Sequence, residues 1–208
     1  MFLRRPSLCA VAAAAVVLGM ALWAAEPAST QEQNARLAGQ LLVATPELEG
    51  PLFTRTVIYM VRHDTRSGAM GLIVNRKLGD VPMAVLLKQS GLPSAGAKGS
   101  VRLHLGGPVE ATRIFVLHTD DYAGPDTVKI ANGIAVTTDA AILQSIIEGK
   151  GPRRARFTLG FAGWAPGQLE AEMKAGYWVV VPSDDAIVFD DAYETKWDRA
   201  MAKRRIRL

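Results

Sequence analysis

Residues 55–78 read RTVIYMVRHDTRSGAMGLIVNRKL, and this stretch determines the expected core of the fold. Residues 56–61 and 69–74 are two apolar runs with several β-branched side chains. The polar, turn-prone segment 63–68 joins them and ends in Gly68, which adopts a positive φ without steric cost. The pattern predicts two adjacent antiparallel strands at the centre of a sheet, with both faces buried.

The first 25 residues differ in composition from the rest of the 208-residue chain. Arg4 and Arg5 precede an uncharged apolar run over residues 8–24, and small residues close it. This layout is typical of a secretory signal peptide. Two alternatives stay open, namely an uncleaved membrane anchor and a translation start at Met20 that leaves no export signal. We therefore expect a periplasmic protein if the signal is genuine and a cytoplasmic one if translation starts at Met20. The membrane is a partner only if the segment stays uncleaved.

Composition limits the rest of the chain to one globular domain. Residues 26–36 are polar and read as a linker, and residues 37–208 form the expected domain with a basic C-terminal tail. An apolar content of 49% excludes a mainly disordered protein. The only cysteine is Cys9, so the domain has no disulfide, thiol nucleophile or thiolate metal site.

Strand patterns come in runs, with helical patterns inserted singly, which favours an α+β fold with a mostly antiparallel or mixed sheet. Asn132-Gly133 is a strong signal for a two-residue hairpin turn. Besides the central hairpin, we predict strands at residues 40–45, 101–105, 113–118, 127–130, 134–137, 156–161, 177–181 and 186–189. We predict helices at residues 81–89, 139–148, 166–174 and 191–204.

Seven motifs occur in a fixed order along the domain: LLVATP (41–46), FTRTVIY (53–59), GAMGLIVN (68–75), GGPV (106–109), LHT (117–119), GFAGW (160–164) and GQLEAE (167–172). In order and spacing, the chain resembles the YqgE/AlgH family of bacterial proteins over about residues 37–197. The resemblance implies an α+β fold, a small closed sheet barrel with a bifurcated mixed sheet wrapped by helices. The family carries the label of transcriptional regulator, and the resemblance provides no established catalytic residues for this chain. The chain departs from the family in its N-terminal extension and in Lys77, where many members have proline.

Catalytic and metal-binding signatures are weak. The three histidines, His63, His104 and His118, have no partner histidine at i+2 or i+4, so we assign no metal site. The chain has no Gly-x-Ser-x-Gly turn and no glycine-rich phosphate loop ending in Lys-Ser or Lys-Thr. Glu170 and Glu172 are two positions apart on a predicted helix and therefore point in different directions. We assign no catalytic residue and no cofactor.

Basic residues gather at two places, and we interpret both as solvated surface. One group is Arg153, Arg154 and Arg156, and the other lies within residues 203–207. No helix-turn-helix pair with a polar recognition helix accompanies them, so the sequence does not favour nucleic acid as a partner. The expected partner is a small molecule or another protein.

The polar and glycine positions of the motifs lie at strand ends or helix starts, where loops converge on ligands. We predict that they share one concave binding surface formed by His63, Asn75, Gly106, Gly107, His118, Trp164 and Gln168. The alternative is that each glycine serves its own turn and Trp164 fills core volume. The predicted function is a non-enzymatic binding or regulatory module. The alternative is an enzyme that uses His63 or His118 as general base near the central hairpin.

Overall fold

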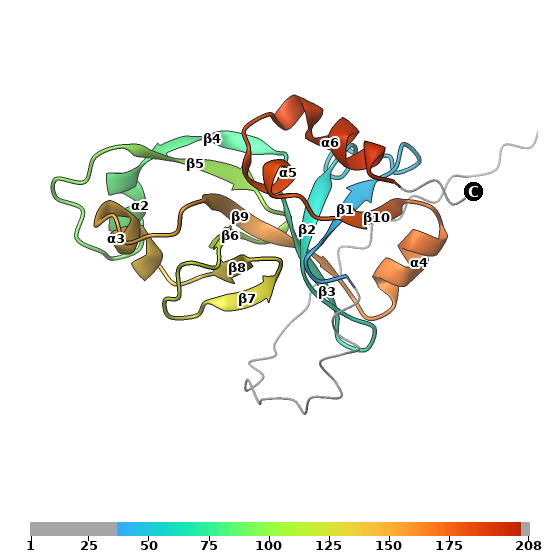
Figure 1. Ribbon diagram of the computed structural model, residues 1–208, viewed down its shortest axis with the longest axis horizontal. Coiled ribbons are helices and arrows are strands. Elements are labelled where there is room, and N and C mark those ends of the chain that lie inside the picture. The colour runs from blue at the N-terminus through green and yellow to red at the C-terminus, as the bar shows by residue number, and fades with distance from the viewer. Residues whose placement is uncertain (1–36, 205–208) are drawn as a thin grey trace, which may run out of the picture.

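The predicted hairpin lies inside the sheet of the computed structural model, which describes residues 37–204 (Figure 1). Its strands are β2 (Val57–Asp64) and β3 (Gly68–Ile73), which pair antiparallel. β1 (Gln40–Ala44) pairs with β2, and β9 (Ala155–Trp164) pairs with β3. The predicted pairing is confirmed, and neither strand of the hairpin is at an edge.

The sheet is bifurcated at β9 and is strongly curled into a half-barrel. Its main path runs β10-β1-β2-β3-β9-β6-β8-β7, while β5 leaves this path, pairing in parallel with β9 and antiparallel with β4. At the open side of this half-barrel, the Tyr59 hydroxyl of β2 donates to the Ala131 carbonyl of β7 at 3.4 Å, so β7 lies next to β2. The predicted α+β class and mixed, branched sheet are confirmed. The remaining strands are β4 (Lys77–Pro82), β5 (Ser100–Leu105), β6 (Val109–Thr119), β7 (Val128–Ala131), β8 (Ile134–Thr137) and β10 (Trp178–Pro182).

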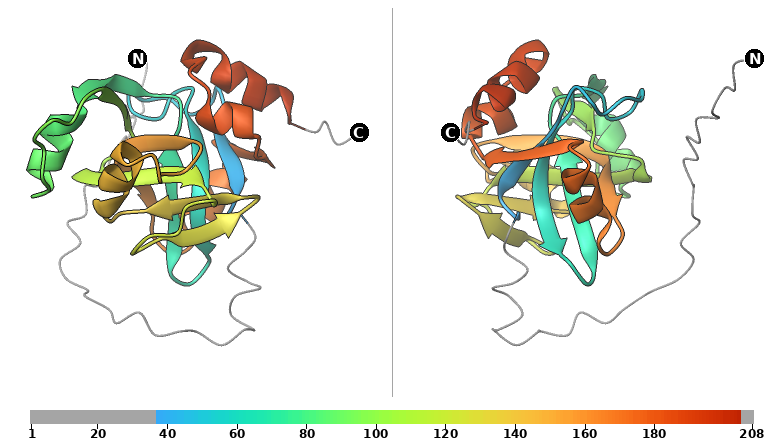
Figure 2. Two further views of the ribbon diagram at one scale, coloured as in Figure 1. Left: turned by 60° about the vertical axis from the view of Figure 1, so that its left-hand side comes forward. Right: turned by 90° about the vertical axis from the view of Figure 1, so that its right-hand side faces the viewer.

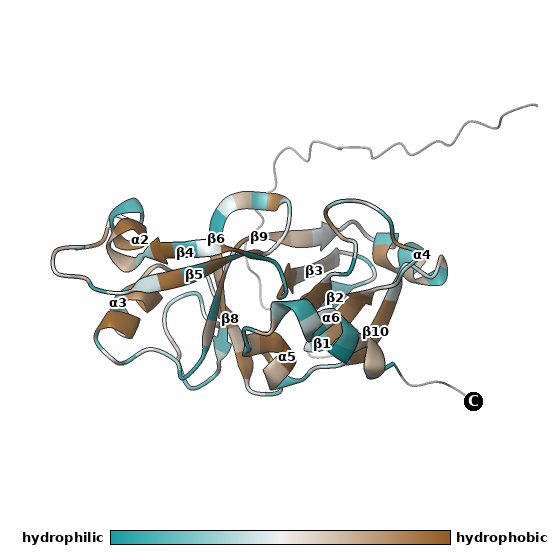
Figure 3. Cartoon of the chain, turned by 90° about the horizontal axis from the view of Figure 1, so that it is seen from above, coloured by the Kyte–Doolittle hydropathy of each residue, from teal (hydrophilic) through white to brown (hydrophobic). Residues whose placement is uncertain are grey.

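Helices cover the sheet at three places (Figure 2). α2 (Met83–Gln89) and α3 (Ala141–Ile147) pack together at the end that carries β4 and β5. α4 (Gln168–Lys174) follows β9 and lies beside β3 and β10. α5 (Asp185–Phe189) and α6 (Tyr193–Ala202) lie over β1 and β2, and the outer face of α6 is hydrophilic (Figure 3).

Both faces of the hairpin are buried, as predicted, because two separate cores lie against it. Alternate residues of β2 point to opposite sides. Val57 and Tyr59 belong to the core beneath α5 and α6, which we call the α6-side core. Ile58 and Met60 belong to the core beneath α4, which we call the α4-side core. This explains why the sequence of β2 is a continuous apolar run rather than an alternating one.

Three glycines allow the connection from β5 to β6 to cross β9 with backbone against backbone. A Cβ on Gly106 would lie 2.1 Å from the Gly160 carbonyl oxygen, and a Cβ on Gly107 would lie 2.1 Å from the Phe161 carbonyl carbon. Gly160 has a φ of +66°, and its own Cβ would lie 2.4 Å from the Gly107 carbonyl oxygen. No side chain fits at these distances, so the crossing requires glycine.

Two predictions of secondary structure need correction. Residues 186–189, predicted as a strand, form α5, because the Asp184 carboxylate accepts hydrogen bonds from the backbone N–H groups of Ala186 and Ile187 and starts a helix there. β4 was not predicted, because this edge strand is largely exposed and carries Lys77 and Asp80 rather than an apolar pattern. A bulge at Leu78, these charges and a terminal proline are features that keep an edge strand from pairing with other chains.

The predicted signal segment and the linker lie outside the described residues. Among residues 37–204, no helix combines the length and apolarity needed to cross a membrane.

Intact-mass analysis of the protein from its own host tests the signal prediction. We expect a mass that begins near residue 26, because a cleaved signal peptide ends at small residues such as those of positions 24–25. A mass that begins at Met1 would contradict cleavage. A mass that begins at Met20 would instead identify the start site.

Candidate functional site

The seven residues predicted to share one surface lie at three places in the structure. His63, Trp164 and Gln168 lie together beside α4, because Ala69 pairs with both His63 and Trp164, and Trp164 and Gln168 both donate to Glu172. Asn75 lies near Gly106, whose carbonyl accepts from the Ile73 N–H at 3.0 Å, and His118 lies apart from both groups.

His63 lies at one end of the β2–β3 hairpin, opposite Ala69. Asn75 lies at the other end, where its side chain contacts Val57. Six residues of strand separate Val57 from His63, which corresponds to roughly 20 Å.

His118 and Trp164 are further apart still. His118 pairs with Ala155 at the start of β9, and Trp164 ends the same strand. Nine strand residues separate these two ends, roughly 30 Å along β9. Gly106 lies between them and donates its N–H to the Leu159 carbonyl at 2.8 Å. Periodicity placed each residue on its element, but the sheet order that separates the elements came only from the structure.

Asn75 has a structural role. Its Oδ1 accepts from the Val57 N–H at 2.9 Å, and its Nδ2 donates to the Arg55 carbonyl at 2.9 Å. The side chain thus ties the end of β3 to the start of β2 and satisfies both of its own polar atoms. It has little polar capacity left for a ligand.

Replacing Asn75 with alanine should lower the free energy of unfolding by about 1–2 kcal/mol, because two hydrogen bonds to backbone groups are lost. Urea denaturation of the variant and of the parent protein measures the change. Asn75→Asp keeps the acceptor for Val57 but sets a carboxylate oxygen against the Arg55 carbonyl oxygen, so it should be destabilised as well. An unchanged midpoint for Asn75→Ala would contradict the structural role.

His118 is completely buried, and both ring nitrogens are occupied. Nδ1 lies 2.8 Å from the Thr119 carbonyl oxygen, and Nε2 lies 2.8 Å from the Thr137 hydroxyl. Burial lowers the pKa of His118 and so favours its neutral form. A general base needs a nitrogen within reach of a substrate, and His118 has none.

Trp164 and Gln168 hold α4 against the sheet. The Trp164 and Trp178 indole N–H groups both donate to Glu172 Oε2, at 2.9 and 2.8 Å. Gln168 Nε2 donates to Glu172 Oε1 at 2.9 Å, and its Oε1 accepts from the Ala165 N–H at 3.0 Å, which caps the first turn of this segment. Glu172 is therefore a structural acceptor.

A bulge in β2 decides which face His63 occupies. Met60 pairs with Gly71 and Arg62 pairs with Met70, so Val61 is an extra residue without a cross-strand partner. A bulge of this kind reverses the alternation of side chains after it. Because His63 pairs with Ala69, a member of the α4-side core, its ring lies on the side of α4.

His63 is the one predicted residue that keeps unused polar capacity. Its side chain is 6% exposed, and Nε2 lies 2.8 Å from Glu170 Oε1 on α4. Nδ1 is buried and has no hydrogen-bond partner among the described residues. When Nε2–H donates to Glu170, Nδ1 carries a lone pair that accepts a hydrogen bond or binds a metal ion. Glu170, to which the sequence assigned no catalytic role, is thus part of this candidate site.

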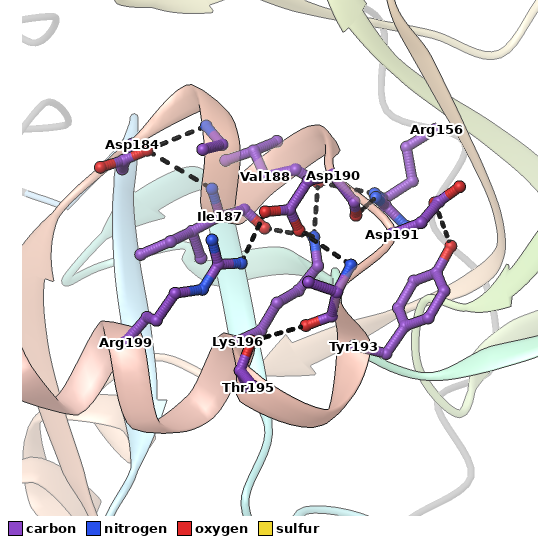
Figure 4. A network of polar contacts seen from close by, with 12 residues as sticks. Arg156, Asp184, Ile187, Val188, Asp190, Asp191, Tyr193, Thr195, Lys196 and Arg199 are labelled. Atoms are coloured by element: carbon purple, nitrogen blue, oxygen red, sulfur yellow. Dashed lines mark hydrogen bonds and ion pairs between the residues drawn. The ribbon is translucent and has the colours of Figure 1, made fainter.

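A second polar cluster lies between α6, α5 and β9 (Figure 4). Lys196 is fully buried and donates to the Ile187 and Val188 carbonyls at the C-terminal end of α5. Arg156 donates to the Val188 carbonyl at 2.6 Å and to the Asp190 carbonyl at 2.7 Å. Two buried cations therefore satisfy the last carbonyls of a five-residue helix.

His104 joins this cluster from β5. Arg156 Nη1 lies 2.6 Å from His104 Nε2, and Nδ1 lies 3.0 Å from the Phe157 carbonyl oxygen, which fixes the proton on Nδ1. Burial, followed by the charge of Arg156, lowers the pKa of His104 to about 4. His104 is therefore neutral at physiological pH.

Sequence reasoning missed this cluster. Arg156 was grouped with Arg153 and Arg154 as solvated surface, but it is only 3% exposed. Arg153 and Arg154 do lie at the surface, paired with Asp121 and Asp185. The available signal was Arg156 inside an otherwise apolar strand pattern, and Lys196 one turn from Ala200 on the buried face of α6.

The arrangement of elements defines a small α+β protein with a branched half-barrel sheet. A family model described as AlgH-like matches residues 41–208. A UPF0301 protein of Methylococcus capsulatus is 42% identical over 175 residues, which cover 84% of this chain and 95% of that protein. A UPF0301 protein of Caulobacter vibrioides is 44% identical over 169 residues, which cover 80% of this chain and 86% of that protein. The chain belongs to the AlgH-like family.

Solved structures agree with this assignment. The solution structure of the AlgH protein from Pseudomonas aeruginosa matches with a TM-score of 0.68 and 37% identity, covering 79% of this chain and 87% of that chain. A crystal structure of a Corynebacterium diphtheriae protein matches with a TM-score of 0.65 over 86% of this chain and 93% of that chain. Its identity of 22% makes it evidence for the fold alone.

Proposed function

We propose that this protein is a non-enzymatic binding module whose ligand contacts His63 and Glu170 beside α4. The observation that carries the proposal is the buried Nδ1 of His63, which has no partner among the described residues. A buried acceptor without a partner costs free energy, so a ligand that supplies a hydrogen-bond donor or a cation gains by binding there. The remaining candidate polar side chains already bond within the protein.

The geometry around His63 also gives a second candidate function, an enzyme with His63 as general base. An enzyme of this type orients its base through a carboxylate, and Glu170 lies 2.8 Å from Nε2 in that manner. The base must also reach a substrate through its other nitrogen. No second polar group of the described residues lies within hydrogen-bond reach of Nδ1 to act with such a base, which favours binding over catalysis.

Direct recognition of DNA has less support. The cations Arg153, Arg154 and Lys203, exposed or half-buried, each pair with a carboxylate, at 2.8, 3.4 and 2.8 Å respectively. Phosphate binding would have to compete with these ion pairs. A gel shift that weakens steeply with salt would support DNA binding and count against the proposal.

A ligand screen on the full chain tests the proposed function. Metabolites and divalent transition-metal ions are added to three proteins, namely the parent chain, His63→Gln and Thr65→Ala. Thr65 lies in the turn after β2 and is exposed, so its variant is a matched control. A ligand of the folded state raises the melting temperature.

We expect at least one compound to stabilise the parent chain and Thr65→Ala but not His63→Gln. Mass spectrometry of each such compound after incubation then separates the two functions. An unchanged compound supports a binding module, and a converted compound supports the enzyme. No stabilising compound, or equal stabilisation of His63→Gln, would count against a site at His63.

A further inference from the structure

Lys196 occupies a position that lysine seldom takes, because none of its side-chain surface is exposed. Its Nζ donates to two α5 carbonyls and lies 3.3 Å from Asp190 Oδ1 (Figure 4). Arg156 from β9 shares one of these carbonyl acceptors, Val188. A single lysine therefore joins α6, the end of α5 and the turn between them.

The charges that face Lys196 are unbalanced. Arg156 approaches from β9 and Arg199 from α6, where Arg199 Nη2 lies 2.7 Å from Asp190 Oδ2. Asp190 is the only carboxylate paired with Lys196 among the described residues. His104 of β5 is neutral because its pKa is lowered. The Lys196 Nζ lies 5.7 Å from the ring centre of Tyr193 on α6, and the Tyr59 hydroxyl of β2 donates to the Ala131 carbonyl. The remaining carboxylates around the cluster pair with other cations: Asp184 with Lys203, Asp185 with Arg154, and Asp191 with Arg102.

The helices joined by Lys196 cover the α6-side core. Ile187 and Val188 of α5 and Ala200 of α6 pack with β1 and β2 residues in that core. We call residues 185–202 the α5–α6 cover. Beyond the packing of its apolar side chains, the cover is held by Lys196, by Arg156 and by the Trp197 N–H, which donates to the Ala44 carbonyl at 2.7 Å.

We propose that the α5–α6 cover is a pH-responsive element that tightens as the pH rises above neutral, with Lys196 as its sensor and Arg156 as its fixed anchor. This inference is independent of the proposed ligand site, which lies on the α4 side of the sheet. When Lys196 loses its proton, the excess positive charge beside Arg156 and Arg199 is relieved. The neutral amine keeps two N–H donors for the Ile187 and Val188 carbonyls.

The direction of the effect follows from linkage. Burial, followed by the charge of Arg156, lowers the pKa of Lys196 from 10.5 to about 7 in the closed state. An open cover exposes the amine to water and restores its ordinary pKa. Between these two values only the open state keeps the proton, so each rise of one pH unit favours closure by up to tenfold. Below about pH 7 both states are protonated, and the effect levels off.

Hydrogen exchange of the full chain at pH 7.0 and pH 8.5 tests the proposal. Protection factors, which correct for the intrinsic pH dependence of exchange, should rise about tenfold for the α5–α6 amides. Amides of α2, which packs in a different core, should change much less, because local opening of α2 leaves Lys196 buried. This measurement needs no substitution, so it stands even if a variant fails to fold.

Two variants identify the sensor. Lys196→Met keeps the length of the side chain without a charge, and the rise in protection should disappear. Lys174→Met removes an exposed lysine from α4, and the rise should remain. The proposal is overturned if α5–α6 protection is the same at both pH values, if Lys196→Met keeps the rise, or if α2 rises equally with α5–α6.

Discussion

A Gly107→Ala variant should fail to accumulate as a folded protein. The added Cβ would lie 2.1 Å from the Phe161 carbonyl carbon and 2.2 Å from the Ala162 nitrogen. These are backbone atoms of the central strand β9, so no rotation of a side chain relieves the contact. Either β9 or the β5–β6 connection must move, and both the parallel β5–β9 pair and the β6–β9 pair depend on their positions. We expect a loss above about 4 kcal/mol, which is a large part of the stability of a small domain.

Gly79→Ala is the matched control for this prediction. Gly79 lies in β4, and a Cβ there would meet no atom within 4 Å. Its stability should stay within about 0.5 kcal/mol of the parent protein. Circular dichroism and urea denaturation of both variants measure the difference. A Gly107→Ala variant as stable as Gly79→Ala would contradict the close crossing of the two backbones.

An Arg156→Met variant should lose about 3–5 kcal/mol of unfolding free energy, because three buried or half-buried acceptors lose a charged hydrogen-bond donor. The substitution leaves the Asp190 carbonyl and His104 Nε2 without their Arg156 donor and removes one donor from the Val188 carbonyl. It also removes a positive charge beside Lys196, so the pKa of Lys196 should rise. Urea denaturation measures the first effect, and NMR titration of the lysine side chain measures the second.

Arg154→Met provides the comparison for Arg156→Met. Arg154 is about half exposed and lies 3.4 Å from Asp185, so its removal should cost less than about 1 kcal/mol. Equal losses for the two variants would mean that Arg156 is not the buried anchor described here.

The central hairpin could be predicted because β2 and β3 are long apolar runs that follow each other in the sequence, joined by a short turn. Residues 186–189 show where local pattern fails, since four mostly apolar residues fit a strand or a short helix equally well. The Asp184 cap decides for the helix, and a cap two residues away is a weaker signal than the apolar run. The local sequence pattern therefore predicted the long strands correctly, but it did not decide the type of a short element such as α5.

The candidate site was less predictable for a different reason. The face on which His63 lies depends on one unpaired residue, Val61, and no composition rule announces a bulge within an apolar run. The Arg156–Lys196 cluster joins residues 40 positions apart through the carbonyls of α5. Such contacts arise from the order of strands in the sheet, which one sequence does not state.

Nitrogen-15 NMR of the imidazole rings tests the central claim most directly, because the chain has only three histidines to resolve. The binding account predicts that His63 carries its proton on Nε2 without ligand and that a stabilising compound shifts its Nδ1 resonance. His104 and His118, whose nitrogens already bond within the protein, should stay unchanged. A compound that binds and shifts His118 or His104 while leaving His63 Nδ1 unaffected would contradict the account.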